Sequence, residues 1–321
     1  MTKPSSHVVP LEACLQTLPR TPLVPVRLDA GEPTIWCKLE FLNPSGSTKD
    51  RIAAHILGKA WRQGRLRAGD LVVEASSGST SIAMAMVAAQ LRLRFVAVMP
   101  EGVSNERHLI IRAFGGEVRT TPRALGIRGA MEATERIVLE EGAFCPRQFE
   151  NPENAEAHRF GTATEVIDQI PGGTLDAFVS GVGTGGTLVG VYQGCRDRGV
   201  DVKPVAAIPV SRGTTSGLAC FGAPETCCFS GRIPGVIESM SKLYAKDSLA
   251  GLEEIEVHDE RALSVARALV HRGFPVGPSS GLNLAAAIDI AKKLGDDARV
   301  VTVFPDRMER YFSTELFGAR S

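Results

Sequence analysis

Residues 43–51 of the chain read Asn43-Pro44-Ser45-Gly46-Ser47-Thr48-Lys49-Asp50-Arg51. They form a small polar turn between a strand-like run, 34–40, and a helix-like run that follows, and Ser47 or Thr48 can cap that helix. An ammonium group at the first turn of a helix is disfavoured by the positive end of the dipole, which suits an amine that acts as a nucleophile or forms a Schiff base. On this turn alone, Lys49 is equally well interpreted as a surface lysine.

Strand-like and helix-like segments alternate along most of the chain. This alternation predicts an α/β fold in which mostly parallel sheets carry helices on both faces. Two segments break it: 8–33 predicts an extended arm with room for one short helix, and 209–247 is irregular. The expected strands lie at 34–40, 71–74, 95–100, 115–119, 176–180, 204–208 and 299–304. The expected helices lie at 50–65, 82–89, 104–114, 126–141, 155–169, 187–198, 259–272 and 282–294.

The length and composition indicate a globular protein of about two domains. The chain has 321 residues, of which 44% are hydrophobic, and 36 Lys and Arg balance 36 Asp and Glu. This balance favours neither nucleic acid nor an anionic membrane as a partner. No apolar run is long enough to span a bilayer, and the N-terminus lacks the apolar segment of a signal peptide. The polar, turn-rich segment 148–154 indicates a crossing between domains.

The seven cysteines show neither a disulfide nor a metal-binding pattern. They include no CxxC pair and no Cys/His cluster at zinc spacing, so no metal is expected. An odd count in a long chain favours reduced thiols, and therefore a cytoplasmic location. Cys227 and Cys228 are adjacent, but two ordinary loop thiols explain them better than a redox pair.

The glycine-rich turn 181–187, Gly181-Val182-Gly183-Thr184-Gly185-Gly186-Thr187, lies directly between a predicted strand and a predicted helix. Its amides can converge on an anion at the helix N-terminus, which predicts a phosphate site. The turn also matches the GxGxxG pattern of dinucleotide sites. Such a site needs an acidic residue after the next strand, and none follows Ile208, although Arg212 leaves a 2′-phosphate possible.

Two further turns carry hydroxyl groups in front of predicted helices. Ser76-Ser77-Gly78-Ser79-Thr80-Ser81 offers hydroxyls and free amides to a carboxylate or a phosphate, although an ordinary serine-rich cap explains it equally simply. The turn 277–281 offers hydroxyls without charge. All three turns should meet at the carboxyl edge of parallel strands, where a lysine, a phosphate cradle and a carboxylate loop would suit pyridoxal phosphate (PLP) and an amino acid.

Six blocks in chain order resemble the cysteine synthase and cystathionine β-synthase family of PLP enzymes. Residues 38–51 resemble its K-x-E-x-x-N-P-x-x-S-x-K-x-R segment. Residues 76–81 stand where the family has T-S-G-N-T-G. The other blocks are 148–152, 181–187, 279–281 and 304–314. The resemblance covers nearly the whole chain, and six ordered blocks are far more specific than any one of them.

The resemblance implies PLP fold type II, which is like that of the tryptophan synthase β subunit. Two α/β domains, each with an open and mostly parallel sheet, are then expected to enclose the active site in the cleft between them. The smaller domain is expected to comprise 46–151, and the larger one 1–45 together with 152–321. The resemblance also implies a homodimer.

The resemblance assigns roles to individual residues. Lys49 would form the Schiff base with PLP and then act as base for the α-proton, and Ser279 would face the pyridine nitrogen. The phosphate cradle would comprise Gly183, Thr184, Gly185, Gly186 and Thr187. Ser79 would face the cofactor, and the carboxylate of the substrate would bind to Ser76, Ser77, Gly78, Thr80 and Gln148.

The implied reaction is a β-replacement on a β-substituted L-alanine, such as O-acetylserine or O-phosphoserine. It would pass through an aminoacrylate, to which sulfide, another thiol or a different nucleophile adds. The same apparatus would serve β-elimination, as in a cysteine desulfhydrase or a serine/threonine dehydratase, although Thr184 differs from the all-glycine loop of the dehydratases. A non-catalytic paralogue is disfavoured by Lys49, and a nicotinamide oxidoreductase by the missing acid after Ile208.

Three departures from the family pattern concern the substrate. Ser79 stands in place of an asparagine that contacts the cofactor 3′-oxygen, and a serine is shorter and has a single donor. Ser81 replaces a glycine. The loop 230–239 lacks the usual small residues, so Arg232 or Glu238 has a possible role at the substrate, and an arginine there would suit a phosphorylated serine. Both are equally well interpreted as solvent-facing charges.

Overall fold

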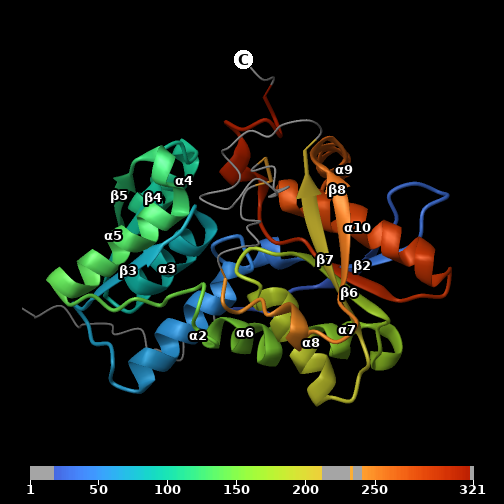
Figure 1. The fold of residues 1–321 in the computed structure, drawn as a ribbon, viewed down its shortest axis with the longest axis horizontal. Coiled ribbons are helices and arrows are strands. Elements are labelled where there is room, and N and C mark those ends of the chain that lie inside the picture. Colours follow the sequence, from blue (N-terminus) through green and yellow to red (C-terminus); the bar gives the residue numbers. More distant parts are fainter. Residues whose placement is uncertain (1–17, 212–231, 234–240, 319–321) are drawn as a thin grey trace, which may run out of the picture.

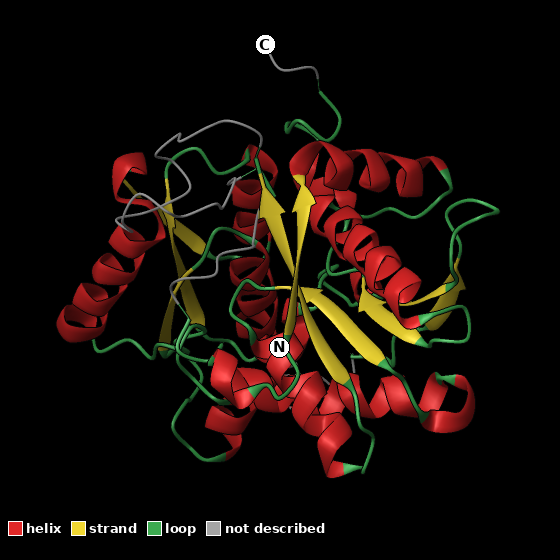
Figure 2. Cartoon of the chain, turned by 45° about the vertical axis from the view of Figure 1, so that its right-hand side comes forward, coloured by secondary structure: helices red, strands yellow, loops and turns green. Residues whose placement is uncertain are grey.

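The computed structural model describes residues 18–211, 232–233 and 241–318. Within these ranges the chain forms two sheets with helices packed around them (Figures 1 and 2). The larger sheet has the strand order β1-β2-β9-β6-β7-β8 and the smaller one β3-β4-β5. Every neighbouring pair is parallel except β1 with β2. The predicted α/β class with parallel, helix-flanked sheets is confirmed.

The elements follow one another in a regular order. The strands of the larger sheet are β1 (Leu23–Val26), β2 (Ile35–Lys38), β6 (Ala177–Gly181), β7 (Lys203–Val210), β8 (Glu253–His258) and β9 (Val300–Val303). Those of the smaller sheet are β3 (Leu71–Ala75), β4 (Arg94–Pro100) and β5 (Glu117–Thr121). The helices are α2 (Lys49–Arg62), α3 (Ser79–Gln90), α4 (Asn105–Ala113), α5 (Gly126–Glu141), α6 (Glu153–Ala157), α7 (Ala163–Gln169), α8 (Gly186–Asp197), α9 (Asp259–His271) and α10 (Pro278–Leu294).

Successive residues of the smaller sheet are buried on opposite faces. In β3, Val72 packs with α2, α3 and α4, whereas Leu71 and Val73 pack with α5 on the other face. Because both faces are covered, the strand is buried along its whole length without alternation, as expected for a parallel sheet, and Glu74 is its one charged residue. The larger sheet has a core of its own, centred on residues such as Phe178 and Phe304. Each sheet therefore belongs to a separately packed unit.

Two edge strands, β1 and β8, were not predicted from the sequence. β1 lies in the segment expected to be an extended arm, and it pairs antiparallel with β2 although it contains Pro25. A proline is tolerated there because β1 is at the edge of the sheet. β8 alternates exposed acidic residues with buried Ile255 and Val257, and it pairs with β7. Strands at edges bury one face only, so their apolar signal is weak.

Two helices differ from the predicted ones. α10 begins at Pro278 rather than at residue 282, because the fixed φ of proline favours the first helical position. Ser279 therefore lies in the first turn of the helix rather than in the loop before it. The helix expected at 155–169 is divided into α6, a π-helical turn (His158–Thr162) and α7. In the π-helical turn, His158 Nδ1 lies 2.9 Å from Thr162 Oγ1.

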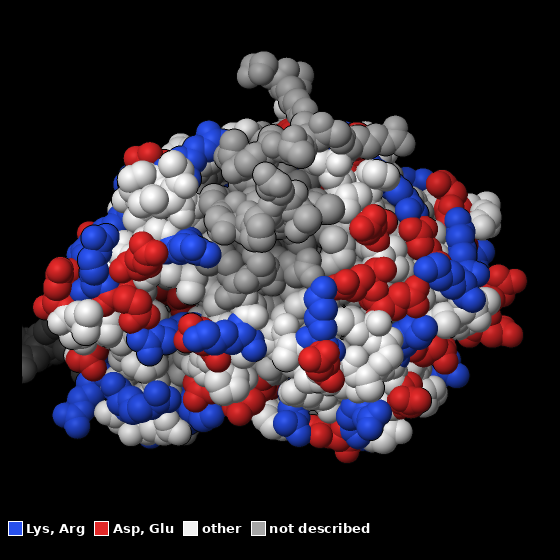
Figure 3. All heavy atoms as spheres, in the orientation of Figure 1, with Lys and Arg blue, Asp and Glu red and all other residues white. Residues whose placement is uncertain are grey.

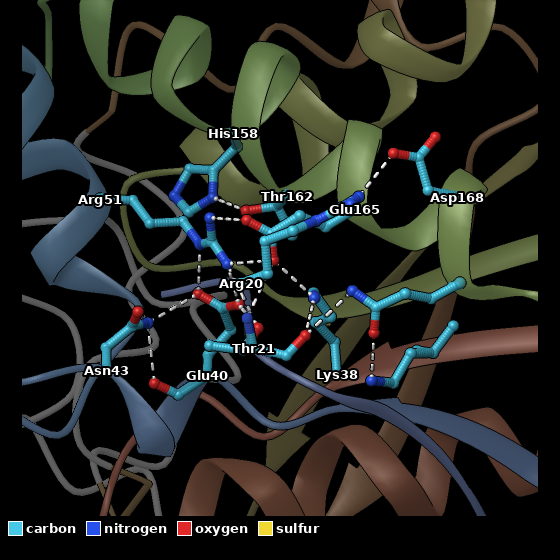
Figure 4. Close-up of polar contacts among 12 residues, drawn as sticks. Arg20, Thr21, Lys38, Glu40, Asn43, Arg51, His158, Thr162, Glu165 and Asp168 are labelled. Carbon is cyan, nitrogen blue, oxygen red and sulfur yellow. Dashed lines mark hydrogen bonds and ion pairs between the residues drawn. The ribbon is translucent and has the colours of Figure 1, made fainter. Parts of the chain in front are cut away.

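A buried charge network lies beneath the first turn of α2 (Figure 4). Arg51 makes bidentate bonds at 2.6 and 2.7 Å to Glu40, and at 2.7 and 2.9 Å to Glu165. Lys38 Nζ donates to Glu165 at 2.7 Å, and Asn43 Nδ2 donates to Glu40 at 3.0 Å. Two cations balance two carboxylates, so no charge is left unpaired away from water. The charged residues around Lys49 in the family segment thus serve to anchor α2 and β2 to α7.

This network makes acid destabilisation predictable. Burial alone would raise the pKa of Glu40, but the adjacent Arg51 holds it at about 2. A carboxyl whose folded pKa is depressed stabilises the protein above the pKa of the unfolded chain, and this stabilisation is lost as pH falls through the folded pKa. A shift from 4.5 to about 2 corresponds to roughly 3 kcal/mol, lost between about pH 4.5 and pH 2.

We therefore expect Glu40→Gln to lower the free energy of unfolding most at neutral pH. Urea unfolding at pH 7 and at pH 3 measures the difference in the free energy of unfolding between the wild type and the variant. It should shrink at pH 3, because Glu40 of the unfolded wild-type chain is then mostly protonated while the folded carboxyl is still ionised, which removes part of the stabilisation. An equal difference at both pH values would contradict the assignment.

Candidate active site

One cavity lies between the carboxyl edges of the two sheets. It encloses about 950 Å³ of empty space, its open mouth included. Residues that follow β3 and residues that follow β6 and β9 line it together. Open α/β sheets bind ligands at this edge because the strand ends leave polar turns and helix N-termini facing one crevice. Of the thirteen predicted site residues, all line this cavity except Gly78 and Gly186.

Lys49 is the first residue of α2 and projects into the cavity. The hydroxyl of Ser47 accepts a hydrogen bond from the Lys49 amide at 3.3 Å, whereas the hydroxyl of Thr48, the residue just before the helix, is buried without a partner among the described residues. Burial lowers the pKa of Lys49, and the negative charge of Asp306 acts in the opposite direction. Its Nζ has no hydrogen bond or ion pair with the described residues. A half-buried amine without such a partner, and with a lowered pKa, is suited to covalent chemistry.

The glycine-rich turn joins β6 to α8 and faces Lys49 across the cavity. The amides of Gly183, Thr184 and Gly185 make no hydrogen bond to the described residues. Gly185 has a φ of +80°, and a Cβ on Gly186 would collide with the side chain of Asn154. Only glycine meets both requirements, which leaves the free amides and the N-terminus of α8 directed at one point.

Two side chains that the sequence analysis did not single out fix this turn. Asn154 Nδ2 donates to the Thr184 hydroxyl at 2.9 Å and to the Gln148 carbonyl at 2.8 Å. His158 Nε2 lies 3.2 Å from the Thr187 hydroxyl, and burial lowers the pKa of His158 to about 3, so the ring is neutral. Asn154 belongs to the polar segment 148–154, but its position relative to the turn depends on the tertiary fold.

Ser279 lines the cavity from the first turn of α10. One turn later, Asn283 accepts a hydrogen bond from the Gly181 amide at 2.7 Å and donates to the Val303 carbonyl at 2.9 Å. This buried asparagine holds α10 against β6 and β9. Ser279 is thereby placed on the same side of the cavity as the glycine-rich turn.

The carboxylate loop, residues 76–80, forms the wall that comes from the smaller sheet. Thr80 Oγ1 donates to Gln148 Oε1 at 2.6 Å, and Gln148 Nε2 donates to the Ala75 carbonyl at 2.7 Å. Gly78 has a φ of +149°, and a Cβ there would collide with Arg107. Gly78 therefore shapes the loop without lining the cavity. The hydroxyls and the free N-terminal amides of α3 form a receptor for a carboxylate.

Ser79 and Ser81 have different surroundings. Ser79 Oγ donates to Asp306 Oδ2 at 3.0 Å, and the Tyr311 hydroxyl donates to the same oxygen at 2.6 Å. Because a hydroxyl carries one proton, Ser79 can only accept a further hydrogen bond from a ligand. Ser81 is buried, and its hydroxyl has no partner. Asp306 and Tyr311 line the cavity as well and were quoted from the sequence only as part of a family block.

The loop 230–239 contributes no described residue to the cavity. Arg232 donates to Glu315 at 3.1 Å and to Glu260 at 2.5 Å, and it does not line the cavity. Of the two interpretations of Arg232, these contacts with two carboxylates favour a loop charge over a contact with the substrate. Glu238 and Arg212 lie outside the described residues. So do Cys14, Cys220, Cys227 and Cys228, whereas Cys37, Cys145 and Cys195 are free thiols.

The residues around the cavity fit PLP. A half-buried amine without a hydrogen bond to a described residue suits its aldehyde, free amides at a helix N-terminus suit its phosphate, and the Ser279 hydroxyl suits its neutral pyridine nitrogen. A dinucleotide fits less well. β7, which runs from Lys203 to Val210, carries no acidic residue for a ribose.

Comparisons with known proteins agree with this fit. The model of the family described as pyridoxal-phosphate dependent enzyme matches residues 15–306. The chain belongs to this family. It is 38% identical over 312 residues to the cysteine synthase of Staphylococcus aureus strain N315, which covers 96% of this chain and 98% of the relative. The PLP dependence that the resemblance implied is thereby confirmed.

Solved structures support the fold assignment. The O-acetylserine dependent cystathionine β-synthase of Helicobacter pylori superposes with a TM-score of 0.81 at 31% identity, covering 95% of this chain and 98% of its own. A hydrogen sulfide-producing enzyme of Fusobacterium nucleatum superposes with a TM-score of 0.85 at 31% identity, covering 97% of this chain and 92% of its own. The expected resemblance to the cysteine synthase and cystathionine β-synthase group, and with it fold type II, is confirmed.

Charges on the described surface are mixed. Lysine and arginine alternate with aspartate and glutamate over the face seen in Figure 3, without a field of one sign. Among the described helices, none has both the length and the apolar character needed to cross a membrane. Within the same ranges, no group of three or more histidine, cysteine, aspartate or glutamate side chains is arranged to hold a metal ion.

Proposed function

We propose that the protein catalyses a PLP-dependent β-replacement on a β-substituted L-alanine, with sulfide or another thiol as the nucleophile. The observation that carries the proposal is the arrangement of Lys49, the glycine-rich turn and the carboxylate loop around one cavity. The proteins similar to this chain include a cysteine synthase and an O-acetylserine dependent cystathionine β-synthase. PLP, when bound, supplies an electron sink for the α-carbon of an amino acid.

The side chains of the cavity have separate tasks in this reaction. The carboxylate loop, with Ser76, Ser77, Thr80 and Gln148, binds the α-carboxylate and orients the substrate. Lys49 takes the α-proton at Nζ, and the lowered pKa of this amine favours the neutral form that a base needs. The hydroxyl of Ser279 would face the pyridine nitrogen and carries no charge, so the cofactor would be a weaker electron sink than it is beside a carboxylate. Such a sink is sufficient for a reaction in which the β-substituent departs readily.

β-Elimination by the same residues is the second candidate. The similarity to a hydrogen sulfide-producing enzyme favours it, since release of sulfide from cysteine needs the same proton transfer at Lys49. The two reactions differ only in whether a second nucleophile enters. A non-catalytic paralogue is disfavoured because Lys49 lines the cavity without a hydrogen bond or ion pair to a described residue. A nicotinamide oxidoreductase is disfavoured because β7 carries no acidic residue that could bind a ribose.

The site assignments, the domains and the cellular setting belong to the same proposal. Strands β3–β5 all fall within 46–151 and the other six strands fall outside it, which supports the proposed boundaries of the smaller domain. A homodimer follows from the resemblance. The mixed surface charge and the thiol state of Cys37 and Cys195 support a cytoplasmic location.

A titration of the purified holoenzyme tests the proposed function. O-acetylserine, O-phosphoserine and cysteine are each added, with and without sulfide, while the visible absorbance and the products are followed. We expect a persistent spectral change with at least one ester, and its reversal with formation of cysteine when sulfide is added. Production of pyruvate and sulfide from cysteine, without replacement, would favour elimination. Turnover of serine or threonine alone would favour a dehydratase.

A further inference from the structure

Arg107, on α4, is a buried cation whose side chain makes no hydrogen bond or ion pair within the described part of the chain. It lines the cavity and only 6% of its surface is exposed. Its Nε is buried and has no partner among the described residues. The guanidinium carbon lies 5.0 Å from the centre of the Tyr311 ring. A cation–π contact offsets only part of the cost of removing a charge from water.

Three other buried cations of the described structure have hydrogen-bonding partners for their terminal nitrogens. Lys38 and Arg51 belong to the charge network, and Arg310 donates to the Gly46 carbonyl at 3.1 Å. The carboxylates near Arg107 are committed to other groups. Glu106 accepts from the amide and the hydroxyl of Ser313 at 2.9 and 2.8 Å. Asp306 makes no ion pair with Arg107, and its Oδ2 accepts from Ser79 and Tyr311.

Arg107 lies where the two sheets approach each other above the carboxylate loop. Its side chain contacts the backbone of Gly78, and a Cβ on that glycine would displace it. Ser104, just before α4, donates to the Arg310 carbonyl at 2.9 Å and ties this helix to the 304–314 segment. A single α-carboxylate is already served by the hydroxyls of the loop and by Gln148. The guanidinium is therefore a surplus positive charge in the wall of the cavity.

We propose that Arg107 binds a second oxyanion, in addition to the α-carboxylate of the amino acid. This inference rests on the proposed function and specifies its substrate class. The oxyanion is a phosphate, carboxylate or sulfur oxyanion group, which two sources can supply. It belongs either to the β-substituent of the donor, as in O-phosphoserine, or to an anionic nucleophile, such as thiosulfate. A planar guanidinium offers either group a pair of charge-assisted hydrogen bonds.

Ligands that carry no β-leaving group test the binding step without turnover. L-2-Amino-4-phosphonobutanoate carries a second oxyanion, whereas L-methionine does not. Their dissociation constants are measured from the absorbance change of the holoenzyme, for the wild type, Arg107→Gln and Arg107→Lys. Arg112→Gln is the matched control, because Arg112 lies on the same helix and is exposed.

We expect Arg107→Gln to weaken the phosphonate about 10- to 100-fold, the range typical of a lost hydrogen bond to a charged group, and to leave methionine nearly unchanged. Arg107→Lys should give an intermediate loss of affinity for the phosphonate, because it keeps the charge without the planar guanidinium. This variant also replaces Arg107→Gln in the test if the glutamine variant does not fold. An equal loss for both ligands would show that Arg107 serves the α-carboxylate or the fold. No loss for either would exclude an anion subsite.

Steady-state kinetics then separates the two sources of the oxyanion. If the donor carries it, Arg107→Gln raises the KM of O-phosphoserine relative to that of O-acetylserine. If the nucleophile carries it, the KM of thiosulfate rises relative to that of sulfide. Unchanged ratios in both pairs would overturn the subsite as a substrate site. If neither dead-end ligand alters the wild-type spectrum, the proposed function fails first, and the inference fails with it.

Discussion

Lys49→Ala is expected to abolish turnover without unfolding the protein. The substitution removes the amine that would bind PLP covalently and the base for the α-proton, so the rate should fall at least ~10⁴-fold, as for other essential catalytic groups. Stability should not suffer, because the half-buried amine makes no hydrogen bond or ion pair to the described residues. The measurements are single-turnover kinetics, the visible absorbance, and thermal unfolding of the apoprotein.

Lys59→Ala is the matched control for this experiment. Lys59 lies on the same helix but is partly exposed and paired with Glu153 and Glu156. Borohydride reduction of the holoenzyme, followed by peptide mass analysis, should place the cofactor on the Lys49 peptide in the wild type and in Lys59→Ala. Labelling of another lysine, or full activity of Lys49→Ala, would refute the proposed role.

Arg51→Leu is expected to produce the largest loss of stability. It leaves Glu40 and Glu165 buried with only Lys38 as a neighbouring cation. Breaking a buried pair by removing one partner costs about 3–5 kcal/mol, because an uncompensated charge remains away from water. Urea unfolding of the apoprotein at neutral pH measures the change in the free energy of unfolding.

A surface pair provides the comparison. Arg159 makes bidentate bonds to Asp197 at 2.5 and 2.7 Å, and both side chains are more than a third exposed. Arg159→Leu should therefore cost at most about 1 kcal/mol. Adding Glu40→Gln to Arg51→Leu should recover part of the loss, since one orphaned carboxylate is then removed. Equal costs for the two arginines would contradict a structural role for the network.

Much of the fold is predictable because burial on both faces leaves a strong local signal. β3 is buried throughout and apolar except for Glu74, and it was predicted at 71–74, within one residue of its observed end. β1 and β8 were missed because edge strands bury one face, and Pro25 argued against a strand. The start of α10 at Pro278 was predicted four residues late, since a proline signals a turn as readily as a first helical position.

The site is predictable where a residue acts through its backbone or its immediate neighbours. The glycine-rich turn and the carboxylate loop can be recognised in the sequence as runs of small residues between a strand and a helix. Asn154, Asn283 and Asp306 carry no such local signal. Each acquires its role by touching a segment far away in the chain, as Asp306 does when it accepts a hydrogen bond from Ser79.

The sequence by itself determined the order of the elements, the two turns of small residues that precede α3 and α8, and the position of Lys49 at the start of a helix. These are local properties of backbone geometry, capping and apolar periodicity. Only the tertiary structure decided which charges face the cavity. It pairs Arg232 with Glu260 and Glu315, buries Arg51 among carboxylates, and leaves Arg107 in the cavity wall without a partner among the described residues. The reason is physical: the state of a charge depends on its distance from other charges and from water, and residues distant in sequence set both.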